Sequence, residues 1–259
     1  MYPDEKPRFD KEKDVLIIFR VPCVAYPSGQ GVETIPIGII ITNPIHHIIT
    51  VSLKETEVLK DFYRRPVRNF FTTMRTRFLI QILSRINNYF IKYLEKIEDE
   101  IDRAENSLMQ SMRNKDVIAL FGLQKTTIYF NRAIMANGLV LDNILKGRVV
   151  TLFQEDEDIL DDIITENQQS LEMSMTYYNI LSNTIAAYSS LVSNNLNVVM
   201  KLLTSLTIIL SIPTIVSSIY GMNVILPFEK DPMAFTYTIL LSLLFSMIIA
   251  IIFIKKRYL

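Results

Sequence analysis

The sequence has few of the side chains that build metal centres or nucleophilic catalytic sites. Its 259 residues include two histidines, one cysteine and no tryptophan. Cys23 alone cannot form an internal disulfide, and this histidine and cysteine content cannot build a zinc finger. There is also no P-loop, GxSxG or HExxH motif. The sequence therefore gives no support for an enzyme or for an ATP-driven pump.

Net charge is absent as well, because 27 basic residues balance 27 acidic residues. This balance argues against a dedicated nucleic-acid binder, and we expect no nucleic-acid partner. The first 30 residues contain no apolar core of the secretory type. We therefore expect the large N-terminal part to stay in the cytosol.

Charged residues are missing from two long stretches, residues 202–228 and 232–254. Each stretch exceeds the roughly 20 apolar residues that span a bilayer. Lys201 precedes the first stretch, and basic residues follow the second. The positive-inside rule then places both termini in the cytoplasm and the short connecting loop outside. We expect a multi-pass protein of the plasma (inner) membrane.

The remaining sequence predicts a small sheet followed by long helices. Three β-branched runs bounded by Pro, Gly or Asn predict strands of one sheet: residues 14–21, 34–42 and 48–53. Helical patterns follow at 73–107 and 115–146, and Gly147 predicts the end of the second. Thr151 to Tyr220 contains no glycine and one proline, which predicts a single helix of roughly 100 Å. Such a helix must be bundled with others.

Small polar side chains follow one face of the first apolar stretch. Steps of four and three connect Ser193, Asn197, Met200, Thr204, Thr207, Ser211, Thr214 and Ser218. This spacing keeps one helix face towards a supercoil axis. One explanation is close packing between membrane helices, which small hydroxyls permit. The other is a water-filled pore, which requires several copies of the chain. The stripe continues beyond the apolar stretch, which favours the pore.

The first apolar stretch contains Tyr220-Gly221-Met222-Asn223 near its end. Gly-Met-Asn at this position, a short loop, a second apolar stretch and a basic tail resemble the CorA family of Mg²⁺/Co²⁺ transporters. IPTIVSSIYGMN also follows the family pattern, whereas the loop VILPFEKDPMAF departs from the Met-Pro-Glu-Leu of many members. Residues 7–18 look like the middle of the family's N-terminal domain, so we expect an N-terminally short copy.

The resemblance implies an α+β membrane protein that assembles as a funnel-shaped homopentamer. Each chain would contribute a partial cytosolic αβα-type domain, a long stalk helix and two C-terminal transmembrane helices. The implied boundaries are 1–72 for the α/β domain, 73–149 for a helical hairpin, 150–200 for the stalk, 201–221 for the pore helix, 222–233 for the external loop, 234–254 for the second span and 255–259 for the tail.

The resemblance also implies a selectivity filter of Gly221, Met222 and Asn223. A ring of Asn223 amides can hydrogen-bond the waters that Mg²⁺ keeps, whereas carboxylates would hold the ion too tightly. The implied pore-lining residues are Thr214, Ser211, Thr207, Leu203, Met200 and Asn197. Leu203 and Thr204 remain alternatives for one level of the pore. Met200 and Leu203 would form an apolar gate, and Asn197 a second site for hydrated ions.

Two charged clusters complete the implied machinery. Six acids lie between residues 155 and 162, and helix-start chemistry explains part of this cluster. The resemblance implies that Asp161 and Asp162 bind regulatory Mg²⁺ between subunits. Lys255, Lys256 and Arg257 would anchor the topology and ring the inner pore.

The implied function is passive Mg²⁺ uptake, gated by cytosolic Mg²⁺. The membrane potential would suffice, because a divalent ion gains roughly 4.6 kcal/mol per 100 mV on entry. Mg²⁺ would be both substrate and regulatory ligand, with no organic cofactor. Two alternatives remain: a Zn²⁺, Co²⁺ or Ni²⁺ transporter of the same family, or a non-conducting membrane-anchored sensor or scaffold.

Overall fold

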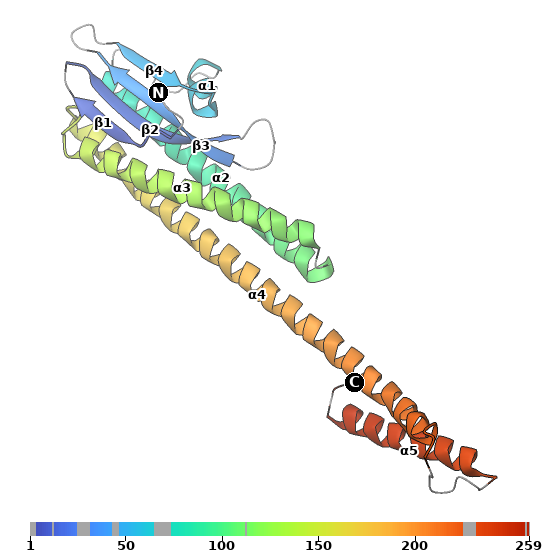
Figure 1. Ribbon diagram of the computed structural model, residues 1–259. Helices are drawn as coiled ribbons and strands as arrows, with labels where there is room; N and C mark the ends of the chain where they lie inside the picture. Colours follow the sequence, from blue (N-terminus) through green and yellow to red (C-terminus); the bar gives the residue numbers. More distant parts are fainter. Residues whose placement is uncertain are drawn as a thin grey trace. The chain divides into compact units, whose positions relative to one another are not determined.

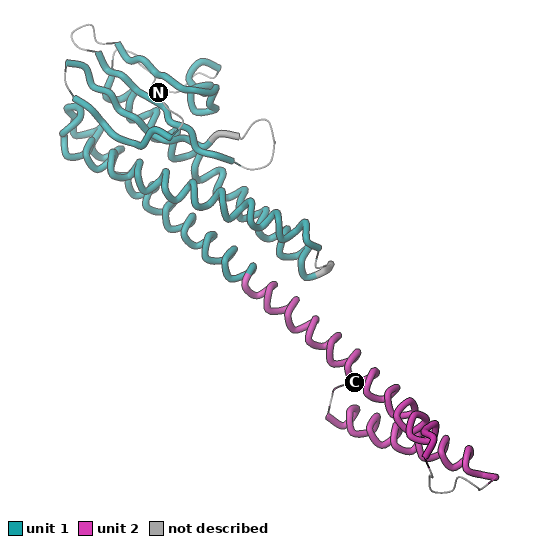
Figure 2. Tube along the Cα trace, viewed as in Figure 1, with its two compact units in different colours: residues 1–185 teal, residues 186–259 magenta. Residues whose placement is uncertain are grey.

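The computed structural model describes residues 4–11, 13–24, 32–42, 47–64, 74–111, 113–224, 232–256 and 258. Its elements are β1 (Arg8–Lys11), β2 (Val15–Val24), β3 (Val32–Ile41), β4 (Ile48–Ser52), α1 (Glu57–Arg64), α2 (Arg75–Ser111), α3 (Asn114–Leu145), α4 (Gln154–Tyr220) and α5 (Ala234–Lys255) (Figure 1). The chain forms two compact units, residues 1–185 and 186–259 (Figure 2). Helix α4 contributes to both.

The sheet is antiparallel throughout, with strand order β1-β2-β3-β4. The three predicted strands are confirmed as β2, β3 and β4. Strand β1 was missed because its sequence, RFDK, is mostly charged. It forms through edge pairing with β2, in which Phe9 lies opposite Ile17. Charged side chains of this kind also protect a sheet edge from pairing with other chains.

One face of the sheet forms the core of the first unit. Alternate residues of β2 and β3 are buried on this face: Val15, Ile17, Phe19, Val21, Ile35, Ile37, Ile39 and Ile41. Helix α3 packs against both central strands, and α2 packs against β2 (Figure 1). The Phe90 and Phe130 rings join the two helices edge to face, with centroids 5.2 Å apart. An αβα domain also requires helices on the other face of the sheet, and this second helical layer stays a prediction.

The helical hairpin has a longer first helix than its sequence predicts. Helix α2 reaches Ser111 and α3 begins at Asn114, which leaves a shorter turn than residues 107–114. Gly147 adopts a φ of 66° and donates its N–H to the Ile144 carbonyl at 2.9 Å. A side chain disfavours this left-handed conformation, so glycine ends the helix here as predicted.

The first part of α4 packs onto the hairpin through a regular stripe. Its buried residues are spaced by three and four positions: Leu160, Ile163, Asn167, Ser170, Ser174, Tyr177 and Leu181. Polar members of the stripe form hydrogen bonds with the hairpin. The Tyr177 hydroxyl donates to Glu98 at 2.7 Å, and the Ser174 hydroxyl donates to the Thr127 carbonyl at 3.1 Å. The predicted bundling of the long helix is therefore provided, over residues 154–185, by α2 and α3 of the same chain.

Helix α1 was not predicted from the sequence. Thr56 precedes it and accepts a hydrogen bond from the Leu59 N–H at 3.3 Å, which caps its first turn. The helix packs on α2, where the Phe62 and Phe78 rings meet edge to face at 5.4 Å. With only eight residues, α1 depends on this tertiary contact rather than on its own propensity.

Candidate ion pathway and regulatory site

In the part of the chain that the structure describes, two helices are long and apolar enough to cross a membrane, α4 and α5. Helix α5 has 22 residues, about 33 Å at 1.5 Å per residue, which matches a hydrocarbon core of about 30 Å. Helix α4 is far longer, so only its C-terminal part can lie in the apolar layer. The part of α4 from residue 186 onward and α5 form the second unit.

Hydroxyl groups mediate the contact between α4 and α5. Ser205 of α4 and Ser242 of α5 are both buried. Pro213 lies inside α4 and has no N–H to donate to the Ile209 carbonyl four residues earlier. The Ser246 hydroxyl of α5 donates to that carbonyl instead, at 3.4 Å. In an apolar layer a backbone carbonyl requires such an internal partner.

The α5-facing side of α4 lies roughly opposite the predicted polar stripe. Ser205, Ile209, Ile212 and Val216 are buried or half-buried and share one face, at about 100° per residue. The face that carries Thr207, Ser211 and Thr214 is centred about 160° away by the same geometry. Most of the predicted pore-lining side chains are exposed, and Ser211 is half-buried: Asn197, Met200, Leu203, Thr207, Ser211 and Thr214. Within this unit the stripe therefore does not serve the α4–α5 contact.

The hydroxyls of the stripe donate to their own helix. Thr207 donates to the Leu203 carbonyl at 2.8 Å, and Ser211 donates to the Thr207 carbonyl at 2.7 Å. Thr214 makes the same type of bond to Leu210 at 3.4 Å. Since each hydroxyl has one proton and two lone pairs, these oxygens keep acceptor capacity on the exposed face. Such a surface can accept hydrogen bonds from water.

Gly221 continues the last turn of α4 rather than reversing it. Its N–H donates to the Ser217 carbonyl at 2.9 Å, and its φ lies outside the left-handed region. A Cβ on this residue would lie 3.2 Å from the Ser217 oxygen, which is a tight contact. Gly221 therefore does not form the left-handed cap that often ends helices. Met222 and Asn223 follow in an exposed turn.

The acidic cluster of α4 divides into two groups. Glu155, Asp156 and Glu157 lie in the first turn, where negative charge favours helix formation. Arg77 of α2 pairs with Glu155 at 3.1 Å and with buried Asp156 at 2.6 Å. Asp158, Asp161 and Asp162 are exposed.

Metal ligands do not converge within one copy of the described chain. In the described residues, no group of three or more His, Cys, Asp or Glu side chains could hold a metal ion. The predicted regulatory acids Asp161 and Asp162 are therefore not brought together with further ligands here. Any site that they form requires groups from elsewhere.

The C-terminal basic residues lie at the end of α5. Lys255 is in its last turn, and Lys256 donates its N–H to the Ile252 carbonyl at 3.0 Å. Both side chains are exposed, while the predicted Arg257 lies outside the described residues. The Tyr258 ring lies 5.9 Å from the Lys201 ammonium, so this end of α5 returns to the start of the charge-free stretch in α4.

The sequence analysis assigned no role to the serines in the second span. Thr238, Ser242 and Ser246 occur at intervals of four residues and therefore share one helix face. That spacing could have identified the side of α5 that meets α4. The partner carbonyl of Ile209 was not accessible to the same argument, because it depends on the rotation of both helices.

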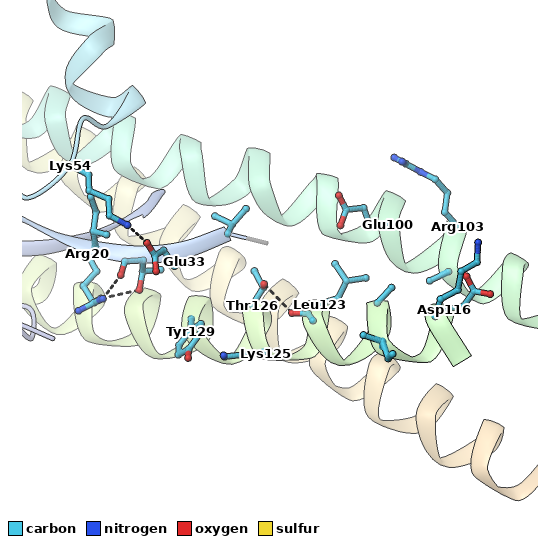
Figure 3. A pocket seen from close by; sticks show the side chains of 18 of the residues that line it. Arg20, Glu33, Lys54, Glu100, Arg103, Asp116, Leu123, Lys125, Thr126 and Tyr129 are labelled. Carbon is cyan, nitrogen blue, oxygen red and sulfur yellow. Dashed lines mark hydrogen bonds and ion pairs between the residues drawn. The ribbon is translucent and has the colours of Figure 1, made fainter. Parts of the chain in front are cut away.

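A separate cavity of about 1460 Å³ lies in the first unit, between β3 and the far half of the hairpin (Figure 3). Several of its charged side chains bind one another or the nearby backbone. Lys54 pairs with Glu33, and Arg20 donates to Thr34 through Nε at 2.9 Å. None of the predicted site residues lines this cavity. Its mixed charge gives no preference for a cation or an anion.

Comparison with known proteins identifies the family. Residues 1–257 match the family described as "CorA-like Mg2+ transporter protein". The chain belongs to the CorA family. This membership confirms the resemblance carried by Gly221-Met222-Asn223, and the family is one of transporters rather than enzymes.

Two CorA relatives align over much of the chain. The "Cobalt/magnesium transport protein CorA" of Methanocaldococcus jannaschii is 26% identical over 260 residues, covering 98% of this chain and 80% of the relative. The protein of the same name from Thermotoga maritima is 28% identical over 179 residues, covering 67% of this chain and 50% of the relative.

Solved structures agree with the CorA fold. The complete M. jannaschii CorA magnesium transporter superposes with a TM-score of 0.87, at 26% identity over 99% of this chain and 81% of that one. The full-length CmaX protein gives a TM-score of 0.72 at 15% identity, over 99% of this chain and 78% of that one, a likeness of fold alone. The shared CorA architecture is an α/β domain with an antiparallel sheet, a long stalk helix and C-terminal membrane helices.

Proposed function

We propose that this chain forms a passive channel that takes up Mg²⁺ along the membrane potential. The observation that carries the proposal is the hydroxyl stripe of α4, which lies opposite its contact with α5 and ends near Gly221-Met222-Asn223. The printed name of the CorA family, and those of two relatives, support Mg²⁺ as substrate.

A pore requires several copies, because two membrane helices cannot enclose one. Large apolar side chains on α4 remain more than 40% exposed just before the charge-free stretch: Leu191, Val192, Leu196, Val198 and Val199. Solvated helices seldom expose so many, so these side chains support contacts with further copies. In a CorA homopentamer the five α4 helices would surround the axis, with the stripe facing inward and α5 facing lipid.

The proposed selectivity filter is a ring of Asn223 amides at the outer mouth, supported by Gly221 and Met222. Mg²⁺ gives up its water reluctantly. Neutral oxygens can therefore bind the waters of the hydrated ion and select it without holding it too tightly for it to leave. Farther in, Thr214, Ser211 and Thr207 would offer hydroxyl oxygens to the hydrated ion.

The proposed gate lies at the inner end of the stripe. Met200 and Leu203 would form an apolar constriction that closes by losing water, and Asn197 would bind the hydrated ion on its cytosolic side. Thr204 is the alternative to Leu203 at this level. Leu203 and Thr204 are both exposed in the second unit and lie away from the α5-facing side of α4. Either residue is therefore compatible with a position facing the pore.

The proposed regulatory ligands are Asp161 and Asp162, with Mg²⁺ bound between subunits. These acids are exposed, in contrast to Asp156, whose carboxylate Arg77 already engages. Repulsion between unoccupied acids would loosen the assembly when cytosolic Mg²⁺ falls. Binding of Mg²⁺ would hold neighbouring copies together and close the gate.

The proposed topology keeps both termini in the cytoplasm of a plasma (inner) membrane. Lys255, Lys256 and Arg257 would ring the inner opening and oppose leakage of cations. The proposed parts follow the boundaries given above, with the stalk at 150–200, the pore helix at 201–221 and the second span at 234–254.

Ion flux into proteoliposomes tests the proposal directly. Vesicles that contain an Mg²⁺-sensitive dye and an imposed inside-negative potential should fill with Mg²⁺, and Asn223→Ala should abolish the flux. Asn106→Ala, an exposed asparagine on the hairpin, is the matched control and should conduct normally. Equal flux through Asn223→Ala and the unchanged chain would locate selectivity elsewhere.

A second candidate substrate is Co²⁺, which the printed names of the two relatives include. Competition by Co²⁺ in the same assay would separate a Co²⁺, Ni²⁺ or Zn²⁺ transporter from one that prefers Mg²⁺. A folded oligomer that conducts none of these ions would instead indicate a membrane-anchored sensor or scaffold.

A further inference from the structure

Three asparagines lie in the buried core of the first unit, where β2, α2, α3 and α4 meet. Asn87 and Asn137 are each 2% exposed, and Asn167 is 6% exposed. All three line a cavity of about 10 Å³ whose other walls are apolar, including Phe19, Phe90, Leu83, Ile86 and Leu141. Amides in such surroundings require hydrogen-bond partners.

The amide of Asn137 is paired at both ends. Its Nδ2 donates to the Arg20 carbonyl at 2.8 Å, and its Oδ1 accepts from the Arg20 N–H at 2.9 Å. Asn137 therefore satisfies both backbone polar groups of Arg20 in β2.

The amide of Asn87 is paired at one end. Its Nδ2 donates to Glu166 Oε2 at 3.0 Å, while its buried Oδ1 has no partner among the described groups. The reversed orientation would place Oδ1 against the carboxylate of Glu166, which is repulsive. Glu166 thus fixes the direction of the amide and leaves a buried acceptor beside the cavity.

We propose that this cavity binds one water molecule, which donates a hydrogen bond to Asn87 Oδ1. A volume of about 10 Å³ is close to the lower limit for one water molecule, and a buried water needs two to four polar partners. Asn167 lines the same cavity, and Asn137 Oδ1 retains a second lone pair. The water would complete a polar junction that joins all four elements.

The junction would also fix the register of α4 against the hairpin. Asn167 packs closely on α3, because its Oδ1 lies 2.9 Å from the position that a Cβ on Gly138 would occupy. A slide of α4 by one helical turn would bring Ile163 or Leu171 to this place and separate Asn87 from Glu166. Apolar side chains cannot bind the water, so the hydrated junction exists in one register only.

A density map of the full chain in lipid nanodiscs, at a resolution that resolves ordered waters, tests the site. The expected result is a water peak within hydrogen-bond distance of Asn87 Oδ1, in contact with Asn167. An empty cavity, or a direct protein partner for Asn87 Oδ1, would overturn the proposal. This measurement needs no variant and does not depend on ion flux.

A pair of variants tests the contribution of the junction to stability. Asn87→Leu should remove the water peak and lower the unfolding temperature by several degrees. Asn88→Leu is the matched control, because the neighbouring Asn88 is exposed and should tolerate leucine. Equal unfolding temperatures for both variants would refute a register role for Asn87.

Discussion

Gly138 offers a test in which helix propensity and packing predict opposite signs. Replacing glycine by alanine inside a helix normally stabilises it by about 0.5–1 kcal/mol. Helix α3 contains two glycines, and they differ in their surroundings. A Cβ on Gly122 would meet no atom within 4 Å, whereas a Cβ on Gly138 would meet Asn167 Oδ1 at 2.9 Å.

The clash at Gly138 should outweigh the gain in propensity. Relief of a 2.9 Å contact requires the Asn167 amide to swing, and this side chain is 6% exposed, so it has little room. Overpacking of a core costs about 1–3 kcal/mol, and a buried amide without partners costs a similar amount. We therefore expect Gly138→Ala to destabilise by up to about 2 kcal/mol net.

Urea or thermal unfolding of the two variants and the unchanged chain provides the assay. Gly122→Ala should be as stable as the unchanged chain or more so, and Gly138→Ala less stable. A change of 1 kcal/mol shifts the unfolding temperature of a domain of 150–250 residues by about 2–4 °C, so the variants should be separable. If Gly138→Ala proved as stable as Gly122→Ala, the close contact with Asn167 would not constrain the junction.

Further predictions concern the membrane helices, the pH dependence and the regulation. Ser246→Ala should weaken the α4–α5 contact by about 0.6 kcal/mol, and by less in a Pro213→Ala background that restores the helical N–H, as unfolding in bicelles can measure. Burial, together with its hydrogen bond to a carboxylate, raises the pKa of Tyr89 from 10.0 to about 12. The neutral phenol is therefore favoured in the folded state. The free energy of unfolding that it contributes is present below pH 10 and should be lost as the pH rises towards 12. Tyr89→Phe should flatten the pH dependence of the free energy of unfolding in this range. The Asp162→Asn variant should still conduct Mg²⁺ at internal Mg²⁺ concentrations that close the unchanged channel, whereas the control Glu172→Gln should close normally. Equal closure of both variants would exclude Asp162 as a regulatory ligand.

The sequence predicted long, regular elements well and short, context-dependent ones poorly. The β-branched runs and the long glycine-free stretch identify β2, β3, β4 and α4, because their periodicity is local information. Strand β1 and helix α1 form through contacts with the elements that follow them, β2 and α2, and have no such pattern of their own. The buried asparagines were missed because their partners, Arg20 and Glu166, lie far away in sequence.

The candidate site shows the same division. Its hydroxyl stripe could be predicted from spacing, and its motif, Gly221-Met222-Asn223, from the resemblance to the CorA family. The conformation of Gly221 could not, because glycine near a helix end often adopts a left-handed turn, whereas Gly221 continues the last turn of α4. The partner of the Ile209 carbonyl could not either, since it required the rotation of α5 relative to α4.

Helix α4 combines two kinds of packing that suit different surroundings. Between residues 154 and 185 it is held by buried polar groups whose partners are specific, such as Tyr177 with Glu98. The burial and the hydrogen bond to Glu98 raise the pKa of the Tyr177 hydroxyl, so the contact persists throughout the physiological pH range. A misplaced helix would leave such groups unpaired, which costs about 1–3 kcal/mol each.

In the second unit the exposed hydroxyls of α4 bond to their own backbone and need no particular partner. Thr207 and Ser211 are satisfied whichever way neighbouring copies rotate, and their oxygens still accept hydrogen bonds from water. Rotation or tilting of this part of α4 would therefore break few hydrogen bonds within the chain. A pore-lining helix that must move requires this property, and a helix that must hold its register in a cytosolic domain requires the opposite. The change of chemistry along α4 is thus what a gated channel of this architecture needs.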